Sequence, residues 1–245
     1  FRYDERSRAR LLGRMREAVG FGAQVWVVDE GPDVRVDLSG FCIDQTEANS
    51  ASVAQCVDRG GCPPNEFVDH AALTMPAIVP TAIDAEAYCT WRGGRLPTDA
   101  EWDGAARGPQ GESIDWDQKV QANYCGRECR FGDRGAPDDR FEQASPIGSF
   151  THRSPYGLVD TAGNMWEWVL DCFDESVRRR ASGLGDPIAT RDPVCRRFMR
   201  GGSYRSFSGL LERRVAHGSF DIDVPTRGVR CAYDFGTRHN VVGPE

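Results

Sequence analysis

The residues best placed to do chemistry lie in one stretch, residues 160–171, which reads DTAGNMWEWVLD. If this stretch is a strand, successive side chains point to opposite faces. One face then carries Trp166, Trp168 and Leu170, and the other carries Met165, Glu167 and Val169. A carboxylate between two tryptophans is expected to be at least half buried. Because a buried, unpaired carboxylate is costly, Glu167 needs a cation or several hydrogen-bond donors.

Two interpretations of Glu167 follow from its neighbours. Gly163 and Asn164 suit a tight turn that exposes backbone carbonyls. Carbonyls together with one carboxylate form a ligand set suited to Ca²⁺. Alternatively, the stretch is a core strand whose glutamate pairs with one of the many arginines. The residues alone leave both interpretations open.

The composition indicates one large domain, or one domain with an appendage, in 245 residues. A hydrophobic content of 40% and six Trp allow a sizeable core, whereas 27 Gly and 14 Pro predict many turns and irregular loops. The net charge of −7 argues against a nucleic-acid partner and mildly favours cation binding. Apolar residues of the stretch 4–19 form one helical stripe. We therefore expect a helical linker over residues 1–22 and the main domain over residues 23–245.

Nine cysteines are many for a cytosolic protein of this length. Several stand in close or loop-closing pairs: Cys56 and Cys62, Cys125 and Cys129, Cys172 and Cys195. Their spacing does not suit a zinc ribbon, so disulfides in an oxidising compartment are favoured over reduced thiols in the cytosol. The odd number leaves one thiol over, and Cys42 is the candidate. No apolar run is long enough to span a membrane, and the chain starts at Phe1, so we expect an exported bacterial protein whose export signal or anchor lies upstream.

Capping signals and periodicity predict a small set of regular elements. Helices are expected over residues 49–59, with Asn49 or Ser50 as N-cap, after the capping box of Thr81 and Asp84, and after the stronger one of Thr98 and Glu101. Strands are expected at residues 25–28, 34–38, 41–44, 198–204 and 228–233. A hairpin turn is expected at residues 30–33. The stretches 109–154, 173–196 and 205–226 show no sustained period and are expected to be loops.

Four motifs stand in a characteristic order: RLPTDAEW from Arg95, GNMWEW from Gly163, RGGSY from Arg200 and GVRC from Gly228. Taken together, residues 38–235 resemble the formylglycine-generating enzyme (sulfatase-modifying factor) family. The resemblance implies an α+β fold of the C-type lectin-like class. Such a domain has little regular secondary structure, two helices against small twisted sheets, and stabilisation by calcium and disulfides.

The enzymes of this family oxidise a substrate cysteine to formylglycine with O₂ and Cu(I), which two cysteine thiolates hold. The matching positions here are Ser206 and Leu211, and neither side chain is a ligand for Cu(I). No catalytic residue and no copper are therefore expected, and formylglycine-generating activity is not expected. A sister branch uses a three-histidine iron site, but the four histidines here lack the H-x-x-x-H spacing.

The resemblance also implies one or two calcium sites and one further disulfide. The first calcium site would use Asn123, Tyr124, Asp139 and Phe141, with Asp138 as a competitor for Asp139. The second would use the carbonyls of Ala162, Gly163 and Met165 with the Glu167 carboxylate. The further disulfide would join Cys89 and Cys231 and tie the second helix to the last strand.

The resulting functional hypothesis is a non-catalytic domain that binds a peptide, a glycan or a partner protein through the former substrate groove. The groove candidates are Ser203, Tyr204, Arg205, Ser206, Phe207 and Ser208, where exposed aromatic and arginine side chains would supply contact area. Tyr204 and Phe207 could instead be core residues. Two other hypotheses stay open: an oxidoreductase with altered metal chemistry, and a structural domain of a larger exported assembly.

Overall fold

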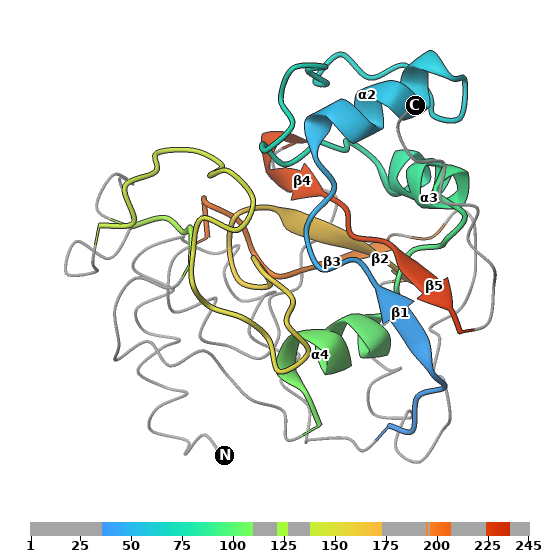
Figure 1. Cartoon of the computed structure of the whole chain (residues 1–245), viewed down its shortest axis with the longest axis vertical. Helices are drawn as coiled ribbons and strands as arrows, with labels where there is room; N and C mark the ends of the chain where they lie inside the picture. The colour runs from blue at the N-terminus through green and yellow to red at the C-terminus, as the bar shows by residue number, and fades with distance from the viewer. Residues whose placement is uncertain are drawn as a thin grey trace.

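The computed structural model describes residues 36–109, 122–126, 138–172, 195, 197–206 and 224–235. These residues form three α-helices and two small sheets. Figure 1 shows how the helices lie around the sheets, with long irregular connections between the elements. The elements, in chain order, are β1 (Phe41–Ile43), α2 (Ser50–Asp58), α3 (Ala82–Trp91), α4 (Asp99–Arg107), β2 (Trp166–Cys172), β3 (Arg197–Arg200), η2 (Val224–Thr226), β4 (Arg227–Gly228) and β5 (Ala232–Asp234).

Two separate sheets organise the described part of the chain. β1 pairs with β5 in an antiparallel ladder of two strands. β2 is the central strand of the other sheet, antiparallel to β3 and parallel to β4. Short strands and long connections of this kind agree with the predicted α+β fold of low regularity.

The helices begin where the capping signals predict. The Asn49 side chain accepts a hydrogen bond from the Ser52 backbone N–H at 2.8 Å, so Asn49 is the N-cap of α2. Thr81 caps α3 and Thr98 caps α4, each in a reciprocal capping box with the residue three positions on. α4 ends at Gly108, whose φ of 66° suits glycine. These three local predictions are confirmed.

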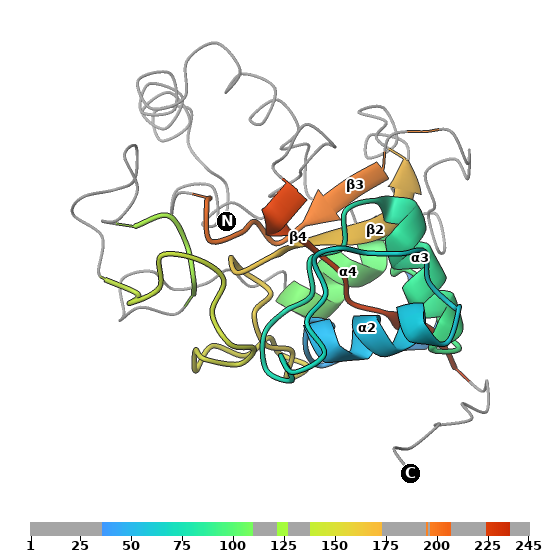
Figure 2. The same cartoon turned by 90° about the horizontal axis from the view of Figure 1, so that it is seen from above.

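β2 is buried on both faces, in agreement with the predicted alternation. Trp166, Trp168 and Leu170 join the main core with residues of α2, α3 and β3. Val169 packs on the other face against Trp102 of α4. α3 and α4 therefore cover opposite faces of the β2 sheet, as Figures 1 and 2 show.

The predicted final strand at residues 228–233 is wrong in one respect, because it is two strands. β4 pairs with β2, whereas β5 pairs with β1, so the chain changes sheets over residues 229–231. The change turns the Arg230 side chain into the interior, where it is fully buried. The strand predicted at residues 34–38 is represented, among its described residues 36–38, by a bridge at Asp37. The strand at 25–28, the hairpin turn at 30–33 and the linker at 1–22 lie outside the described residues.

Three disulfides connect the described residues, and all three were expected. Cys56 pairs with Cys62, and Cys172 pairs with Cys195. The third disulfide joins Cys89 of α3 to Cys231, which directly precedes β5, over a sequence separation of 142 residues. In the chain-entropy model, closing a loop of this length stabilises the fold by about 5 kcal/mol. This bridge therefore fixes α3 against the point where the chain changes sheets.

The other cysteine predictions divide between described and undescribed residues. Cys125 is disulfide-bonded, and its expected partner Cys129 lies outside the described residues. Cys42 is free and exposed on β1, as predicted. Among the described helices, none has the length and apolar character needed to cross a bilayer.

Candidate functional site

Glu167 is the second residue of β2, and both of its carboxylate oxygens already accept hydrogen bonds. Oε1 accepts from Arg230 Nη2 at 2.7 Å, and Oε2 accepts from Arg230 Nε at 2.9 Å and from Trp102 Nε1 at 2.6 Å. Both side chains of the ion pair have no exposed surface. This is the arginine pairing that the sequence left open, in a bidentate geometry.

Arg230 connects three segments that are far apart in the sequence. Besides its bonds to Glu167, its Nη1 donates to the Asp44 carbonyl at 3.1 Å and its Nη2 donates to the Val159 carbonyl at 2.8 Å. Burial opposes the positive charge, but the carboxylates of Glu167, Glu47 and Asp160 together outweigh it, and the pKa of Arg230 is raised. The side chain therefore acts as a permanent internal cation that holds the end of β1, residue 159 and β2 together.

The turn before β2 has the tight geometry that Gly163 and Asn164 predict. Their φ values are 79° and 56°. A Cβ at Gly163 would lie 1.9 Å from the Asn123 carbonyl oxygen, so only glycine fits there. Glu47 stabilises this turn, because its carboxylate accepts hydrogen bonds from Asn164 Nδ2 at 2.6 Å and from the Met165 backbone N–H at 3.0 Å.

Glu47 lies in an environment that disfavours its charge. Burial raises its pKa well above the usual value of 4.5, and the nearby carboxylates of Asp160 and Glu167 raise it further. Burial also raises the pKa of Asp160. Three carboxylates thus share one buried guanidinium, that of Arg230, and Glu47 holds its proton more tightly than a free carboxyl group would.

The Glu167 donor set does not fit a calcium ion. All three hydrogen bonds to its oxygens come from N–H donors, and the guanidinium of Arg230 supplies the compensating positive charge. A divalent cation at the same oxygens would meet that guanidinium at close range. We therefore assign no metal to Glu167 or to the neighbouring carbonyls of Ala162, Gly163 and Met165.

The other expected calcium site fits better, because one of its oxygens has no partner. Among the buried side-chain nitrogen and oxygen atoms of the described residues, Asn123 Oδ1 is the one without a hydrogen-bond partner. The same side chain donates through Nδ2 to the Gln143 carbonyl and to Asn164 Oδ1, which fixes its orientation. An unpaired buried oxygen is costly, and a cation would compensate it.

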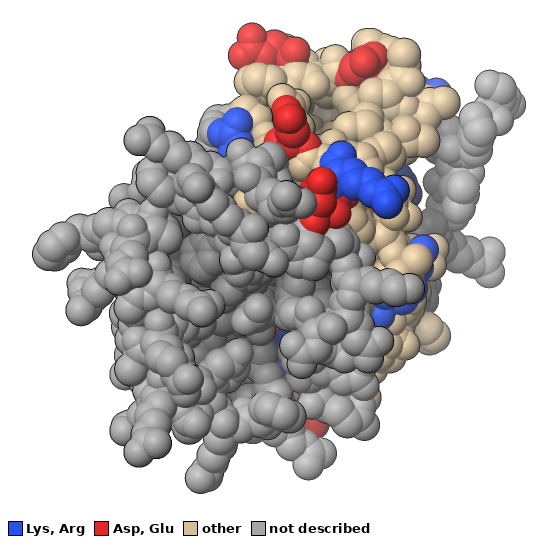
Figure 3. Space-filling model, turned by 90° about the vertical axis from the view of Figure 1, so that its left-hand side faces the viewer, with Lys and Arg blue, Asp and Glu red and all other residues tan. Residues whose placement is uncertain are grey.

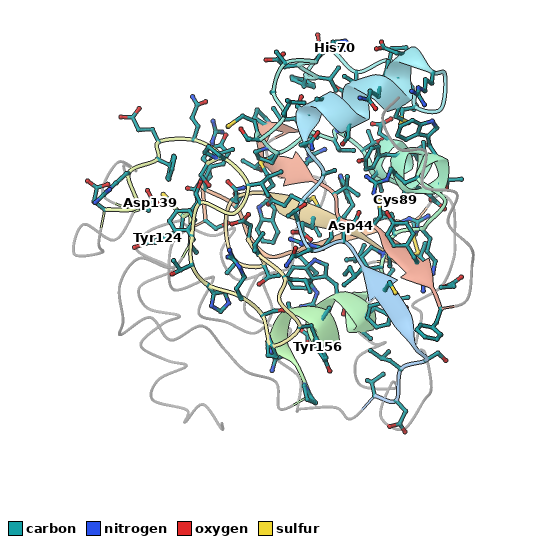
Figure 4. All side chains as sticks on the ribbon, viewed as in Figure 1. Asp44, His70, Cys89, Tyr124, Asp139 and Tyr156 are labelled. Carbon is teal, nitrogen blue, oxygen red and sulfur yellow. A yellow bond between two sulfur atoms is a disulfide. The ribbon has the colours of Figure 1, made fainter. Side chains whose placement is uncertain are left out.

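Asp139 supplies a buried carboxylate to the same region. It is 4% exposed and accepts from the backbone N–H groups of Tyr124 at 2.9 Å and Phe141 at 3.0 Å. Figure 4 shows Asp139 and Tyr124 side by side in this part of the fold. Asp138 instead caps a local turn through the Arg140 N–H. Within the described residues no three His, Cys, Asp or Glu side chains are arranged to hold a metal ion, so a metal here would rely on one carboxylate with neutral oxygens.

The candidate groove follows β3, and its backbone is held by the turn before β2. Tyr204 N donates to the Asn164 carbonyl at 2.9 Å, and the Ser206 carbonyl accepts from Cys125 N at 2.8 Å. The Ser206 hydroxyl accepts from the Ser203 N–H at 2.9 Å. The Ser206 hydroxyl therefore stabilises its own turn.

The groove candidates differ in exposure. Ser203, Tyr204 and Ser206 are buried, and Arg205 is exposed. Tyr204 is thus a core residue, with the Arg205 guanidinium 5.5 Å from its ring centroid. Phe207, Ser208 and Leu211 lie outside the described residues. Of the four described candidates, Arg205 is the side chain that presents its surface to solvent.

Sequence reasoning did not find the partners of Glu167. Trp102 is 65 residues away and Arg230 is 63 residues away, so no local pattern joins them. Arg230 belongs to the GVRC motif and Trp102 to the RLPTDAEW motif. The order of these motifs along the chain was the one signal in the sequence that could have linked the two residues to Glu167. Glu47 carries no motif of its own, and its contacts to the β2 turn span more than 100 residues.

Comparison with known proteins agrees with this fold and with the motifs. The sequence profile described as "Sulfatase-modifying factor enzyme 1-like domain" matches residues 14–235. The chain therefore belongs to this family, the FGE-sulfatase domain family. Its fold is the one that the four motifs predicted.

Two relatives are similar to this chain, one named as an inactive member and one named as an enzyme. The chain is 41% identical over 155 residues to "Inactive C-alpha-formylglycine-generating enzyme 2" of Bos taurus, a match covering 60% of this chain and 52% of the relative. It is 35% identical over 164 residues to "Formylglycine-generating enzyme" of Mus musculus, covering 62% of this chain and 42% of the relative. The match thus spans about half the length of these relatives.

A solved structure supports the fold independently of sequence similarity. The structure of PvdO from Pseudomonas aeruginosa superimposes with a TM-score of 0.66, covering 84% of this chain and 85% of that chain, at 20% identity. Because the two sequences are only 20% identical, the structural similarity establishes the fold alone.

Proposed function

We propose that this domain is a non-catalytic member of its family that binds a peptide, a glycan or a protein partner through the surface around Arg205. The observation that carries the proposal is the role of Ser206. Its hydroxyl accepts a backbone hydrogen bond inside its own turn, at the position where the family's enzymes carry a copper-binding cysteine. The similarity to a relative named as inactive supports the same conclusion.

The loss of copper chemistry follows from ligand softness. Cu(I) prefers thiolates, whereas the Ser206 hydroxyl is a hard donor that is rarely ionised. The sequence carries Leu211 at the second copper position and no cysteine between Cys195 and Cys231. With these residues, the chain supplies no soft ligand pair of its own there.

Several fixed contacts make the surface around Arg205 suitable for recognition. The 203–206 turn is hydrogen-bonded to residues 125 and 164, so Arg205 projects from a rigid base. The Arg205 N–H donates to Ser203 Oγ at 3.2 Å, and its guanidinium lies near the Tyr204 ring. A pre-oriented arginine loses little conformational entropy on binding, and arginine is enriched among residues that dominate binding energy.

We propose one calcium ion in the site formed by Asn123, Tyr124, Asp139 and Phe141. The unpaired Asn123 oxygen and the buried Asp139 carboxylate support it. The side chains would hold the ion, and carbonyl oxygens of Tyr124 and Phe141 would complete an all-oxygen set. The role of the ion is to order this loop region beside the Arg205 turn.

We also propose that the protein works outside the cytoplasm, as an exported bacterial protein. Three disulfides among the described residues support an oxidising compartment. Two of them, Cys56–Cys62 and Cys172–Cys195, close short local loops and would be lost in a reducing cytosol.

Selection of peptides from a random phage-displayed library and screening of immobilised glycans test the binding function. We expect a selected ligand whose affinity falls at least about fivefold in Arg205→Ala. Arg59→Ala is the matched control, because Arg59 is exposed and lies at the end of α2. Equal affinity of both variants for every selected ligand, or no selected ligand, would contradict the proposal.

A further inference from the structure

The outward face of α3 carries a stripe of five residues that are partly or fully open to solvent. Residues 83, 86, 87, 90 and 91 are spaced i, i+3, i+4, i+7 and i+8, so they share one helical face. The opposite face carries Ala85, Tyr88 and Cys89, which are buried in the core. Ile83 is 69% exposed. Figures 1 and 2 show α3 at the margin of the molecule beside α2.

This face borders an open hollow of about 490 Å³. Among the described residues, the hollow is lined by Gly61, Ile83, Glu86, Ala87, Thr90 and Trp91. Ile83, Ala87 and Trp91 supply apolar lining, and Glu86 and Thr90 supply polar side chains. A concave apolar surface with a few polar groups is the usual form of a small-ligand site.

The Trp91 ring is held in a fixed position. A Cβ added at Gly61 would lie 2.3 Å from Trp91 Cδ1, so the ring lies directly against the backbone of this loop. The loop is itself fixed by the Cys56–Cys62 disulfide and by a hydrogen bond from the Gly61 N–H to the Cys56 carbonyl at 2.9 Å. The Tyr88 ring supports Trp91 from the helix, with centroids 6.2 Å apart.

Three polar groups at this hollow are available for a ligand. Glu86 Oε2 accepts from Arg197 Nη2 at 3.1 Å, while Glu86 Oε1 makes no hydrogen bond within the described part of the chain. The Thr90 hydroxyl and the Trp91 indole N–H likewise make none with described residues. The hollow therefore offers an acceptor, a donor and a hydroxyl that can do either.

The charges around the hollow favour a neutral ligand. Glu86 is neutralised by Arg197, and the guanidinium of Arg92, the residue after Trp91, is 40% exposed. A cationic side chain would find no excess negative charge here. Figure 3 shows the side of the molecule away from α3, where described acidic and basic side chains are interspersed as well.

We propose that this hollow is a carbohydrate subsite, with the Trp91 ring stacked on the C–H face of a pyranose. A β-linked glucose or N-acetylglucosamine ring has equatorial hydroxyls and a flat apolar face, which matches a lining of one aromatic ring with polar side chains beside it. Glu86 accepts from a sugar hydroxyl, and the Trp91 N–H and the Thr90 hydroxyl bond to others. The subsite is separate from the Arg205 surface, so either can fail without the other.

Calorimetric titration with cellotriose and chitotriose tests the subsite. We expect one of these probes to bind and to protect Trp91 fluorescence from quenching by iodide. Trp91→Phe keeps an aromatic ring, smaller than the indole, and removes the N–H, and should weaken binding about threefold to tenfold. Ala87→Arg fills the hollow from an outward helical position and should weaken binding at least about tenfold.

The controls distinguish binding at this site from nonspecific binding to exposed aromatic residues and from loss of the folded structure. Tyr156→Ala removes an aromatic residue that is 64% exposed and is not among those lining the hollow, and it should leave affinity unchanged, as should Arg205→Ala. Far-ultraviolet circular dichroism and thermal unfolding of Ala87→Arg should match the unaltered protein. Binding of neither sugar at about 10 mM, or equal affinity in Ala87→Arg, would overturn the proposal. So would saturable binding of basic peptides in place of sugars.

Discussion

Replacing Arg230 with methionine should destabilise the fold more than almost any other single change. Arg230 and Glu167 have no exposed surface, so the substitution leaves a buried carboxylate with Trp102 Nε1 as its remaining donor. Breaking a buried ion pair in this way costs about 3–5 kcal/mol. The carbonyls of Asp44 and Val159 also lose their donors, at about 1–3 kcal/mol each. Since these losses overlap, we expect at least about 4 kcal/mol in total.

Urea unfolding followed by tryptophan fluorescence measures this loss. Arg205→Met is the matched control, because Arg205 is exposed and its loss should cost less than about 0.5 kcal/mol. The double variant Glu167→Met with Arg230→Met should recover at least about 2 kcal/mol relative to Arg230→Met, because no unpaired charge remains. The reasoning is refuted if Arg230→Met costs less than about 1 kcal/mol, or if added Ca²⁺ stabilises the unaltered protein through Glu167.

Three further predictions concern the metal, the buried carboxyl group and the long disulfide. At the proposed calcium site, Ca²⁺ should raise the unfolding temperature with a dissociation constant of about 10⁻⁴–10⁻³ M, the range of extracellular calcium-binding modules, and Asp139→Asn should abolish the effect. An unchanged response in Asp139→Asn would contradict the site. Because burial raises the pKa of Glu47 well above 4.5, the folded state binds this proton more tightly than the unfolded chain, so stability falls as pH rises from about 4.5 towards the folded pKa. Urea unfolding at several pH values should therefore show Glu47→Gln gaining stability relative to the unaltered protein as pH rises, and a pH-independent difference would argue against the shift. Replacing Cys89 and Cys231 with serine should cost about 5 kcal/mol in chemical unfolding, whereas Cys42→Ser should cost almost nothing; equal effects would contradict the assigned pairing.

The sequence predicts this fold where the signal is local. The capping boxes of Thr81 and Thr98 and the alternation in β2 each depend on residues a few positions apart, and the structure confirms them. The short disulfides follow from spacing in the same way. The Cys89–Cys231 disulfide has no such signal and came from the family resemblance.

The interior of the candidate site was less predictable, because its contacts join distant segments. Arg230 was expected inside one continuous strand, but the chain leaves one sheet for another there, and the side chain enters the core. Burial of Glu167 was predicted from its neighbours, yet the choice between a metal ion and a guanidinium depended on that change of sheet. Tyr204 was a groove candidate, but its backbone bond to Asn164 places the turn so that its ring is buried.

The central claim is that the family's scaffold persists here without its copper chemistry, and anaerobic titration with Cu(I) tests it most directly. The protein is titrated under a competing chelator, and cysteine-containing peptides are then assayed for O₂-dependent conversion to formylglycine by mass spectrometry. The account predicts no stoichiometric, tightly bound copper and no conversion. One equivalent of Cu(I) bound together with catalytic turnover would contradict it.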